Sequence, residues 1–284
     1  MAWFSYLKRR EAFSNREGVA AYDFSLLRSR AEQGVSAMVR VRNEAQKISH
    51  CLRSILPVFD EIILVDNASD DDTIDIVRDV IRREDSAGKI KLFSYPYRLA
   101  RFGPEHAATP DDSLHSAVYY TNWTLSHCTR RYVCKWDGDM VLVRERRATF
   151  QEFLHGIQLG RRACWTLSGQ TVYRDEHDDY YLARGEVNKE IEVFPYSLMC
   201  RFKKRPHLES LQRPVIFPKK DFTPVCFFEL KFVDEDEFSH WSEREWPSER
   251  KRREWANYQL VRDGQVSTER FQRLGRTFLD NQVL

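Results

Sequence analysis

The chain has 284 residues, of which 42% are hydrophobic and 13% aromatic, so it can build one large α/β domain with extensions or two small domains. Its formal net charge of +2 argues against a dedicated nucleic-acid-binding protein, because such proteins usually carry a stronger basic excess. The longest aliphatic run, at residues 62–65, is far too short to span a membrane, and the N-terminus lacks the apolar stretch of a signal peptide.

From residue 35 to residue 137 the sequence alternates between expected strands and expected helices. The strands are short apolar or β-branched runs, at residues 35–41, 61–66, 89–95 and 132–136. The helices carry apolar side chains at helical spacing, at residues 44–56 and around residues 74–81 and 114–125. This order predicts a doubly wound α/β fold, with a mixed and mostly parallel sheet flanked by helices.

The remainder of the chain predicts further strands and then a helical extension. The strands are expected at residues 163–173, 190–202 and 224–233, with an acidic loop at residues 175–181. The C-terminal extension, from residue 239, is charged and carries tryptophan, and Pro247-Ser248-Glu249 is typical of a helix start.

Six cysteines are scattered along the chain without Cys-x-x-Cys spacing: Cys51, Cys128, Cys134, Cys164, Cys200 and Cys226. This distribution is typical of buried thiols in a reducing compartment rather than of a disulfide framework or a zinc site. We therefore expect a cytoplasmic protein, either free or at the inner face of the membrane.

Polar side chains follow each of the first four expected strands. They are Arg42, Asn43 and Glu44; Asp66 and Asn67; Arg98 and Arg101; and Asp137, Gly138 and Asp139. Because ligands bind at the carboxyl ends of the strands in open α/β sheets, we expect these groups to share one crevice.

Asp137 and Asp139 form an Asp-x-Asp pair directly after an apolar run. Like charges repel and resist desolvation there, so a cation must offset them or water must reach them. The same spacing occurs at Asp70/Asp72, where helix capping is the simpler interpretation, and at Asp234/Asp236, in an acidic run expected to be exposed. Context, rather than the motif alone, therefore favours the pair at 137–139 as a ligand site.

The order of these motifs resembles family-2 glycosyltransferases with the GT-A (Rossmann-like) fold. The resemblance rests on "VSAMVRVRNEAQKISHCLRSILPVFDEIILVDNASDDDT", continues through Asn122 to "KWDGDM", and covers about residues 35–145. It implies an N-terminal extension at 1–34, a catalytic domain at 35–238 and a helical tail at 239–284. The catalytic domain would consist of a nucleotide-sugar half, 35–145, and an acceptor half, 146–238.

The resemblance also implies an activity: a metal-dependent, inverting hexosyltransferase. It would move a sugar from a nucleotide-diphosphate sugar, a UDP-sugar above all, to a glycan or glycolipid acceptor in cell-surface polysaccharide or lipopolysaccharide synthesis. Nucleic acid is not an expected partner.

By the same resemblance, a Mn²⁺ or Mg²⁺ ion is bound by Asp139 directly, with Asp137 nearer the ribose or bound through water. Asp66 is expected to accept hydrogen bonds from the base or ribose. The remaining donor-binding candidates are Arg42, Asn43, Glu44, Asn67, Arg98, Arg101 and Gly138, with the arginines assigned to phosphate. A hard cation held by carboxylates suits this chemistry, because the departing diphosphate concentrates negative charge.

The acceptor half must supply a base that removes the proton of the attacking hydroxyl. The favoured candidates are Glu209, in a basic stretch beside His207, and then Glu229, which could instead complete the metal site. The other acidic candidates are Glu176, Asp178, Asp179, Glu192 and Asp221. Glu192 alternates with Ile191 and Val193, which predicts the outer face of a strand.

The tail suggests a peripheral membrane contact, because Arg250–Arg253 lie beside Trp246 and Trp255, and Phe271, Leu274 and Phe278 share a face. The alternative is that these aromatic residues pack on the catalytic domain.

Two other functions compete with the transferase. A sugar-phosphate nucleotidyltransferase would also combine an α/β fold with metal-binding carboxylates, but it normally has a glycine-rich loop after the first strand, where this chain has "VRVRNEA". A non-catalytic relative that binds a glycan or a partner would have no need for the carboxylate pair.

Overall fold

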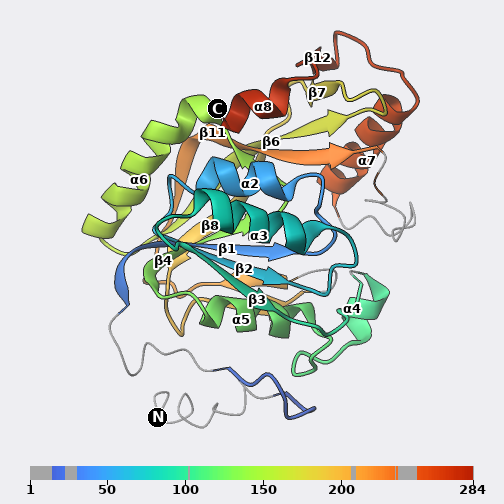
Figure 1. Cartoon of the computed structure of the whole chain (residues 1–284). Helices are drawn as coiled ribbons and strands as arrows, with labels where there is room; N and C mark the ends of the chain where they lie inside the picture. Colours follow the sequence, from blue (N-terminus) through green and yellow to red (C-terminus); the bar gives the residue numbers. More distant parts are fainter. Residues whose placement is uncertain are drawn as a thin grey trace.

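A central mixed β-sheet with helices on both faces organises the chain (Figure 1). The computed structural model describes residues 15–22, 31–101, 103–205, 209–233, 235 and 248–283. The strands of the first half are β1 (Glu32–Val41), β2 (Glu61–Asp66), β3 (Ile90–Ser94) and β4 (Arg130–Asp137). All four run parallel, in the spatial order β3-β2-β1-β4. The predicted α/β class, with a mixed and mostly parallel sheet, is confirmed.

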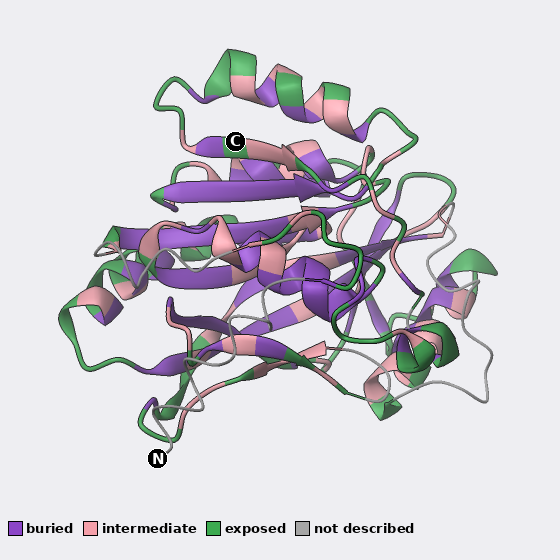
Figure 2. Ribbon diagram, turned by 90° about the horizontal axis from the view of Figure 1, so that it is seen from below, coloured by how far each residue is buried: buried purple, intermediate pink, exposed green. Residues whose placement is uncertain are grey.

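Both faces of β1 are buried, because successive side chains of a strand point to opposite sides of the sheet. Val35, Ala37 and Val39 join one hydrophobic cluster, whereas Met38 joins the other. Figure 2 shows the result as continuous burial along the central strands, with exposed residues concentrated on the outer faces of the helices and on the loops.

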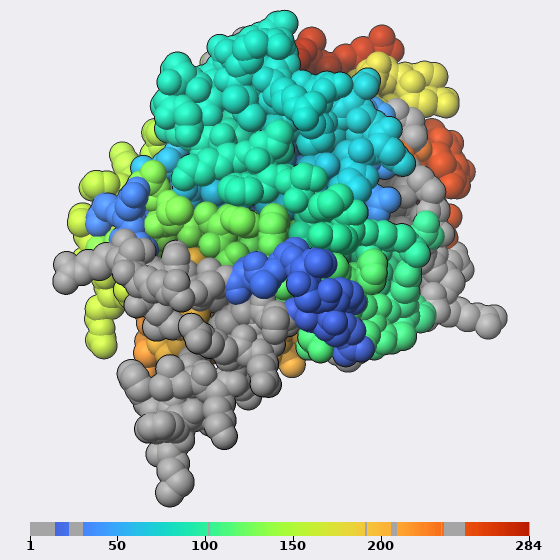
Figure 3. All heavy atoms as spheres, turned by 60° about the horizontal axis from the view of Figure 1, so that its bottom comes forward, coloured from blue at the N-terminus to red at the C-terminus, as the bar shows by residue number. Residues whose placement is uncertain are grey.

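The helices of the first half are α2 (Ile48–Ile55), α3 (Thr73–Glu84) and α5 (Ala117–Ser126), with α4 (Pro104–Ala108) as a short addition that the sequence pattern did not predict. The first predicted helix begins four residues later than expected. The reason is a turn ahead of α2, in which the Glu44 carbonyl accepts hydrogen bonds from the N–H groups of Lys47 and Ile48, at 2.9 Å each. Residues 15–22 lie against α5, where the Tyr119 hydroxyl donates to the Ala20 carbonyl (Figure 3).

The second half extends the same sheet. Its elements are β5 (Met140–Leu142), the 3₁₀ turn η3 (Arg144–Arg146), α6 (Arg147–Leu159), β6 (Cys164–Arg174), β7 (Tyr180–Ala183), β8 (Asn188–Pro195) and β11 (Lys219–Phe232). β8 lies antiparallel between β4 and β6, and β11 runs parallel to β6. A separate two-stranded ribbon is formed by β9 (Arg201–Lys204) and β10 (Glu209–Gln212). The strands expected beyond residue 160 are therefore present.

The C-terminal segment packs onto this sheet. It contains α7 (Glu249–Arg262), β12 (Phe271–Arg273) and α8 (Phe278–Val283), and β12 pairs with β7. The predicted helix start is confirmed, because the Ser248 hydroxyl caps α7 by accepting a hydrogen bond from the Lys251 N–H. The expectation that Phe271 and Phe278 face a membrane is wrong, because both are buried in hydrophobic clusters with the sheet.

No helix among the described residues combines the length and the apolar character needed to cross a lipid bilayer. The six cysteines are free thiols and all are buried, as the sequence predicts. The division into extension, catalytic domain and tail stays a prediction.

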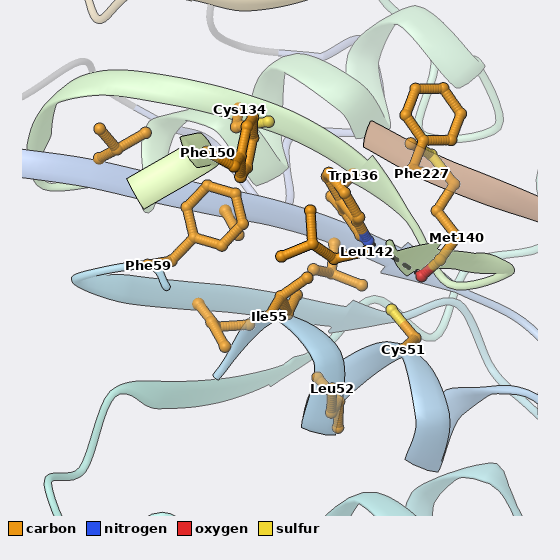
Figure 4. Packing of buried hydrophobic residues seen from close by; sticks show 14 of the residues in the cluster. Cys51, Leu52, Ile55, Phe59, Cys134, Trp136, Met140, Leu142, Phe150 and Phe227 are labelled. Atoms are coloured by element: carbon orange, nitrogen blue, oxygen red, sulfur yellow. Dashed lines mark hydrogen bonds between the residues drawn. The ribbon is translucent and has the colours of Figure 1, made fainter. Parts of the chain in front are cut away.

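An aromatic core lies beneath the end of β4 (Figure 4). Trp136 is fully buried, and its ring lies 6.0 Å from that of Phe59, 6.3 Å from that of Phe150 and 5.8 Å from that of Phe227, centroid to centroid. Offset aromatic contacts of this kind stabilise a core beyond the area they bury. The residue next to Asp137 is therefore held rigidly.

Close packing between β6 and β11 gives a stability prediction. A Cβ added at Gly169 would lie 2.1 Å from the ring of Phe227, so Gly169→Ala should destabilise the protein by about 1–3 kcal/mol through overpacking. Gly156→Ala is the matched control, because nothing lies within 4 Å of the added Cβ in α6 and alanine favours the helix. Urea unfolding measures both, and equal stabilities of the two variants would contradict the packing argument.

Candidate functional site

The turn that carries Asp137, Gly138 and Asp139 joins β4 to β5 and is fixed by the core. The Trp136 indole N–H donates to the Met140 carbonyl at 3.0 Å, and the Leu230 N–H donates to the Asp139 carbonyl at 2.9 Å. These bonds anchor the turn between a buried ring and β11.

Glycine is required at position 138 for steric reasons. A Cβ there would lie 2.8 Å from Cγ1 of Val41 and 3.3 Å from Cγ of Glu44. The turn therefore packs directly against the end of β1, and the predicted donor-site residues Gly138 and Glu44 are brought together.

Sheet register aligns the other strand ends with this turn. Arg40 pairs with Asp137 on one side of β1, and Val41 pairs with Asp66 on the other. The polar groups at the carboxyl ends of β1, β2 and β4 are thus aligned in a row, and the shared crevice stays a prediction.

Asp137 is held by two cations. Its carboxylate lies 2.7 Å from Nζ of Lys135 and 3.3 Å from the guanidinium of Arg40. Burial alone would raise the pKa of Asp137, but the attraction of Lys135 and Arg40 outweighs it and lowers the pKa to about 2. Because its side chain is still 38% exposed, this ionised carboxylate can be reached by a ligand.

Asp139 and Glu229 share a buried lysine. Nζ of Lys231, whose side chain is 3% exposed, lies 2.8 Å from the Asp139 carboxylate and 3.2 Å from that of Glu229. Arg250 adds a second cation to Glu229 at 2.5 Å. Burial opposes ionisation of Glu229, but Lys231 and Arg250 outweigh it and hold its pKa well below the ordinary range.

Arg40 connects the strand ends to the second half of the chain. Its guanidinium donates to the Glu209 carboxylate at 2.7 Å and to the Thr121 hydroxyl at 2.5 Å, in addition to its contact with Asp137. The Arg40 guanidinium therefore lies between the carboxylates of Glu209 and Asp137. Its Oε2 is buried and has no hydrogen-bond partner among the residues that the structure describes.

Sequence reasoning missed the four cations of this site: Arg40, Lys135, Lys231 and Arg250. A signal was available for three of them, since Arg40, Lys135 and Lys231 each interrupt an otherwise apolar strand. A charged side chain in such a run is buried unless the strand is at an edge, and a buried charge needs a partner.

The interpretation of Glu192 as an outer-face residue is wrong. Glu192 is 2% exposed, whereas Lys189 and Glu190 on the same strand are exposed, so both faces of β8 are covered only in its later part. Burial raises the pKa of Glu192, and the ammonium of Lys135, 3.9 Å away, only partly opposes this.

The loops after β1 and β2 hold each other in place. The Asn43 amide donates to the Asp70 carboxylate at 2.6 Å, and the Asp66 carboxylate accepts from the Ser69 N–H at 3.2 Å. Asn67 is buried and donates to the carbonyls of Tyr95 and Tyr97. The turn-forming role of these residues is therefore observed, and their role in donor binding stays a prediction.

The acidic run before α3 serves the backbone. The Asp71 carboxylate accepts from the Thr73 N–H at 2.9 Å and from the Ala45 N–H at 3.1 Å. Asp71 therefore supports the backbone at the start of α3 and ties this loop to the loop after β1, whereas the N-cap residue Asp72 makes no side-chain cap hydrogen bond.

No ion pair between an arginine assigned to phosphate and Asp137 or Asp139 is found among the described residues. Arg42 is exposed, and Arg98, also exposed, pairs with Glu105 at 2.9 Å. Arg101 is exposed as well, and its N–H donates to Glu105. Five residues named from the sequence lie outside the described part of the chain: His207, Asp234, Asp236, Trp246 and Pro247.

The donor set around the turn suits a hard cation, although no group of three or more His, Cys, Asp or Glu side chains in the described ranges is arranged as a metal site. The ion pairs form two groups. Around Asp137 the acids are Asp137, Glu192 and Glu209 and the bases Arg40 and Lys135. Around Asp139 the acids are Asp139, Glu190, Glu229 and Glu254 and the bases Lys231, Arg250 and Lys251. Both groups therefore consist of carboxyl groups in direct contact with cations.

Residues 36–101 match the family described as Glycosyl transferase family 2. The matched segment is less than a quarter of the chain. It contains the carboxyl-terminal part of β1 and all of β2 and β3 with their loops, so the match covers the ends of β1 and β2 beside the Asp137 turn. The comparison with curated proteins finds no match.

Several solved structures are similar to the chain. They include S. aureus TarS 1-349, at 11% identity and a TM-score of 0.40 over 69% of this chain and 60% of that one. A mannosyltransferase from Pyrobaculum calidifontis in complex with GDP-Man and Mn²⁺ is 19% identical, with a TM-score of 0.37 over 49% and 38%. Glucosyl-3-phosphoglycerate synthase from Mycobacterium tuberculosis in complex with phosphoglyceric acid is 22% identical, with a TM-score of 0.31 over 50% and 44%. The chain thus spans less than two thirds of each of these proteins.

The shared lysine gives a prediction with a pH signature. Lys231→Met should destabilise the protein by roughly 3–5 kcal/mol near neutral pH, because two buried carboxylates lose their common cation. The folded-state pKa of Glu229 is lowered, so its contribution is present above the unfolded-state pKa and is lost as the pH falls through the folded-state value. Without Lys231, the carboxylates of the variant are protonated at a higher pH than those of the wild type. The difference in unfolding free energy between the two proteins should therefore shrink in acid.

Urea unfolding over a pH series measures this difference. Lys189→Met, at an exposed lysine of β8 in the same sheet, is the matched control and should stay within about 0.5 kcal/mol of wild type. A loss for Lys231→Met no larger than that of the control would show that the shared ion pair does not stabilise the fold.

Proposed function

We propose that this chain is a nucleotide-sugar glycosyltransferase that moves a hexose to a glycan or glycolipid acceptor with inversion. One observation carries the proposal: the family-2 segment ends its strands beside the Asp137–Asp139 turn, with Arg40 opposite Asp137 and Val41 opposite Asp66 in the sheet register. Carboxylates and cations at this edge of an α/β sheet suit a nucleoside diphosphate.

The donor is bound along this row of strand ends. Asp66 accepts hydrogen bonds from the ribose or base, since it closes the strand next to β1. A bound Mn²⁺ or Mg²⁺ ion would be held by Asp139 and Asp137 and would neutralise charge on the leaving diphosphate. Lys231 forms an ion pair with Asp139 and orients its carboxylate, and Arg42, at the exposed end of β1, is available to the phosphates.

Glu209 is the favoured base, and Glu229 is the less suitable candidate. Glu209 faces the Asp137 carboxylate across Arg40, and its buried Oε2 is the atom that would accept the proton of an acceptor hydroxyl. Glu229 is held ionised by Lys231 and Arg250, which lowers its pKa and its affinity for a proton. Direct attack assisted by one base inverts the anomeric centre.

The donor site predicts selective, metal-dependent nucleotide binding. A thermal-shift panel of UDP, GDP, CDP and dTDP, each with and without Mn²⁺, should show stabilisation by one nucleoside diphosphate with metal. Asp139→Asn should lose this shift and keep its fold, because an amide is a much poorer ligand for a hard cation. Asp263→Asn, at an exposed aspartate after α7, is the control and should keep the shift. No stabilisation by any of the four nucleotides would refute the transferase.

If Glu209 is the base, its substitution should lower turnover without lowering nucleotide binding. Glu209→Gln should keep the nucleotide-induced thermal shift and lose about 10²–10⁴-fold in turnover, the usual contribution of a general base. Turnover is measured as release of nucleoside diphosphate from the sugar donor of the nucleotide that the panel selects. Near-normal turnover in Glu209→Gln, together with an inactive Glu229→Gln that still binds nucleotide, would transfer the role of base to Glu229.

A further inference from the structure

The opposite end of the sheet carries a surface of different chemistry. It consists of residues 159–162 and 213–220, here called the basic–apolar edge. β6 and β11 both begin here, and β6 runs in the same direction as β4 because the antiparallel β8 lies between them. The basic–apolar edge therefore lies at the end of the strands remote from the Asp137 turn.

Exposed apolar side chains are concentrated on this edge. Val215 is 95% exposed, Leu159 73% and Ile216 70%, and these are the three most exposed large apolar residues in the described part of the chain. Single exposed aliphatic residues are ordinary on a protein surface, but a cluster of them marks an interaction site.

The loop that presents Val215 and Ile216 is anchored from within. Phe217 is buried in the core, its N–H donates to the Pro214 carbonyl at 3.0 Å, and Arg213 donates to the Phe217 carbonyl at 2.8 Å. The Pro218 carbonyl accepts a hydrogen bond from the Cys164 N–H at 2.9 Å, which joins the loop to the segment at 159–162. The apolar tip is thus held outward by a compact turn, rather than left exposed by a lack of structure.

Basic residues surround the tip. They are Arg161, Arg162, Arg213, Lys219 and Lys220, and the acidic residue of the adjoining sequence is Asp221. The whole chain carries a formal charge of only +2, so this edge concentrates positive charge. Lys220 lies over the ring of Trp165, 5.2 Å from its centroid, which keeps its ammonium group on the edge.

We propose that the basic–apolar edge binds an anionic lipid bilayer, with Val215 and Ile216 inserted among the acyl chains and the basic side chains at the headgroups. Aliphatic insertion and electrostatic attraction are the two contributions that hold peripheral proteins on such surfaces. Nucleic acid would satisfy the basic residues but leave the aliphatic tip in water. Bound in this way, the strand ends with the Asp137 turn would face away from the lipid.

Co-sedimentation of the full chain with vesicles tests the proposal. The wild type should pellet with phosphatidylcholine–phosphatidylserine vesicles, remain in solution with phosphatidylcholine alone, and dissociate as salt screens the charges. Val215→Ser/Ile216→Ser and Lys219→Gln/Lys220→Gln should each lower the partition coefficient roughly tenfold or more, because each removes one of the two contributions.

Matched variants elsewhere on the surface are the controls. Arg82→Gln/Arg83→Gln removes two exposed charges from α3, and Val187→Ser removes an exposed valine, and both should pellet like wild type. All substituted side chains are exposed, and unchanged melting temperatures confirm folding. Equal pelleting of wild type and both edge variants, or no pelleting of wild type, would overturn the proposal. Concentration-dependent dimerisation that Val215→Ser/Ile216→Ser abolishes, without vesicle binding, would instead assign the edge to a second copy.

Discussion

The repulsion among carboxylates at the end of β4 is the constraint on which the arrangement of the site depends. Asp137 and Asp139 are separated by one residue at the end of a buried strand, where like charges repel and cations nearby offset the repulsion. The protein meets this constraint with Lys135 and Arg40 for the first carboxylate and Lys231 for the second. These cations come from β1, β4 and β11, so the site is complete only when both halves of the sheet are assembled.

The aromatic core and the ionic network act on the same turn from two sides. Trp136 holds the turn through its bond to the Met140 carbonyl, and the cations fix the side chains that project from it. Burying ion pairs is costly unless their geometry is good, and this rigid support provides that geometry. Arg40 extends the network to Glu209 on the β9–β10 ribbon, which connects the family-2 segment with the less regular second half.

The two ends of the strands have separate chemistry. The carboxyl ends of β1, β2 and β4 carry the ionic network, whereas the starts of β6 and β11 carry exposed aliphatic residues among basic ones. Parallel strands make this separation possible, because their carboxyl ends meet at one edge and their starts at the other. A bilayer at one end would therefore leave the other end accessible to a soluble donor.

The sequence by itself determined the elements of the first half and the position of the Asp137–Asp139 turn. Apolar runs separated by helical patterns predict the strands at 35–41 and 61–66. The carboxyl ends of parallel strands lie at the same edge of the sheet, however the helices pack against it. The local sequence pattern could not predict which residues pair with the buried charged side chains. Glu192 has the alternation of an outer face but is buried near Lys135 of β4, and the pairing of Arg40 with Glu209 spans 169 residues. Only the tertiary structure decided these contacts, since the burial of a charged side chain depends on which strands lie beside it, and that order is set by packing across the whole sheet.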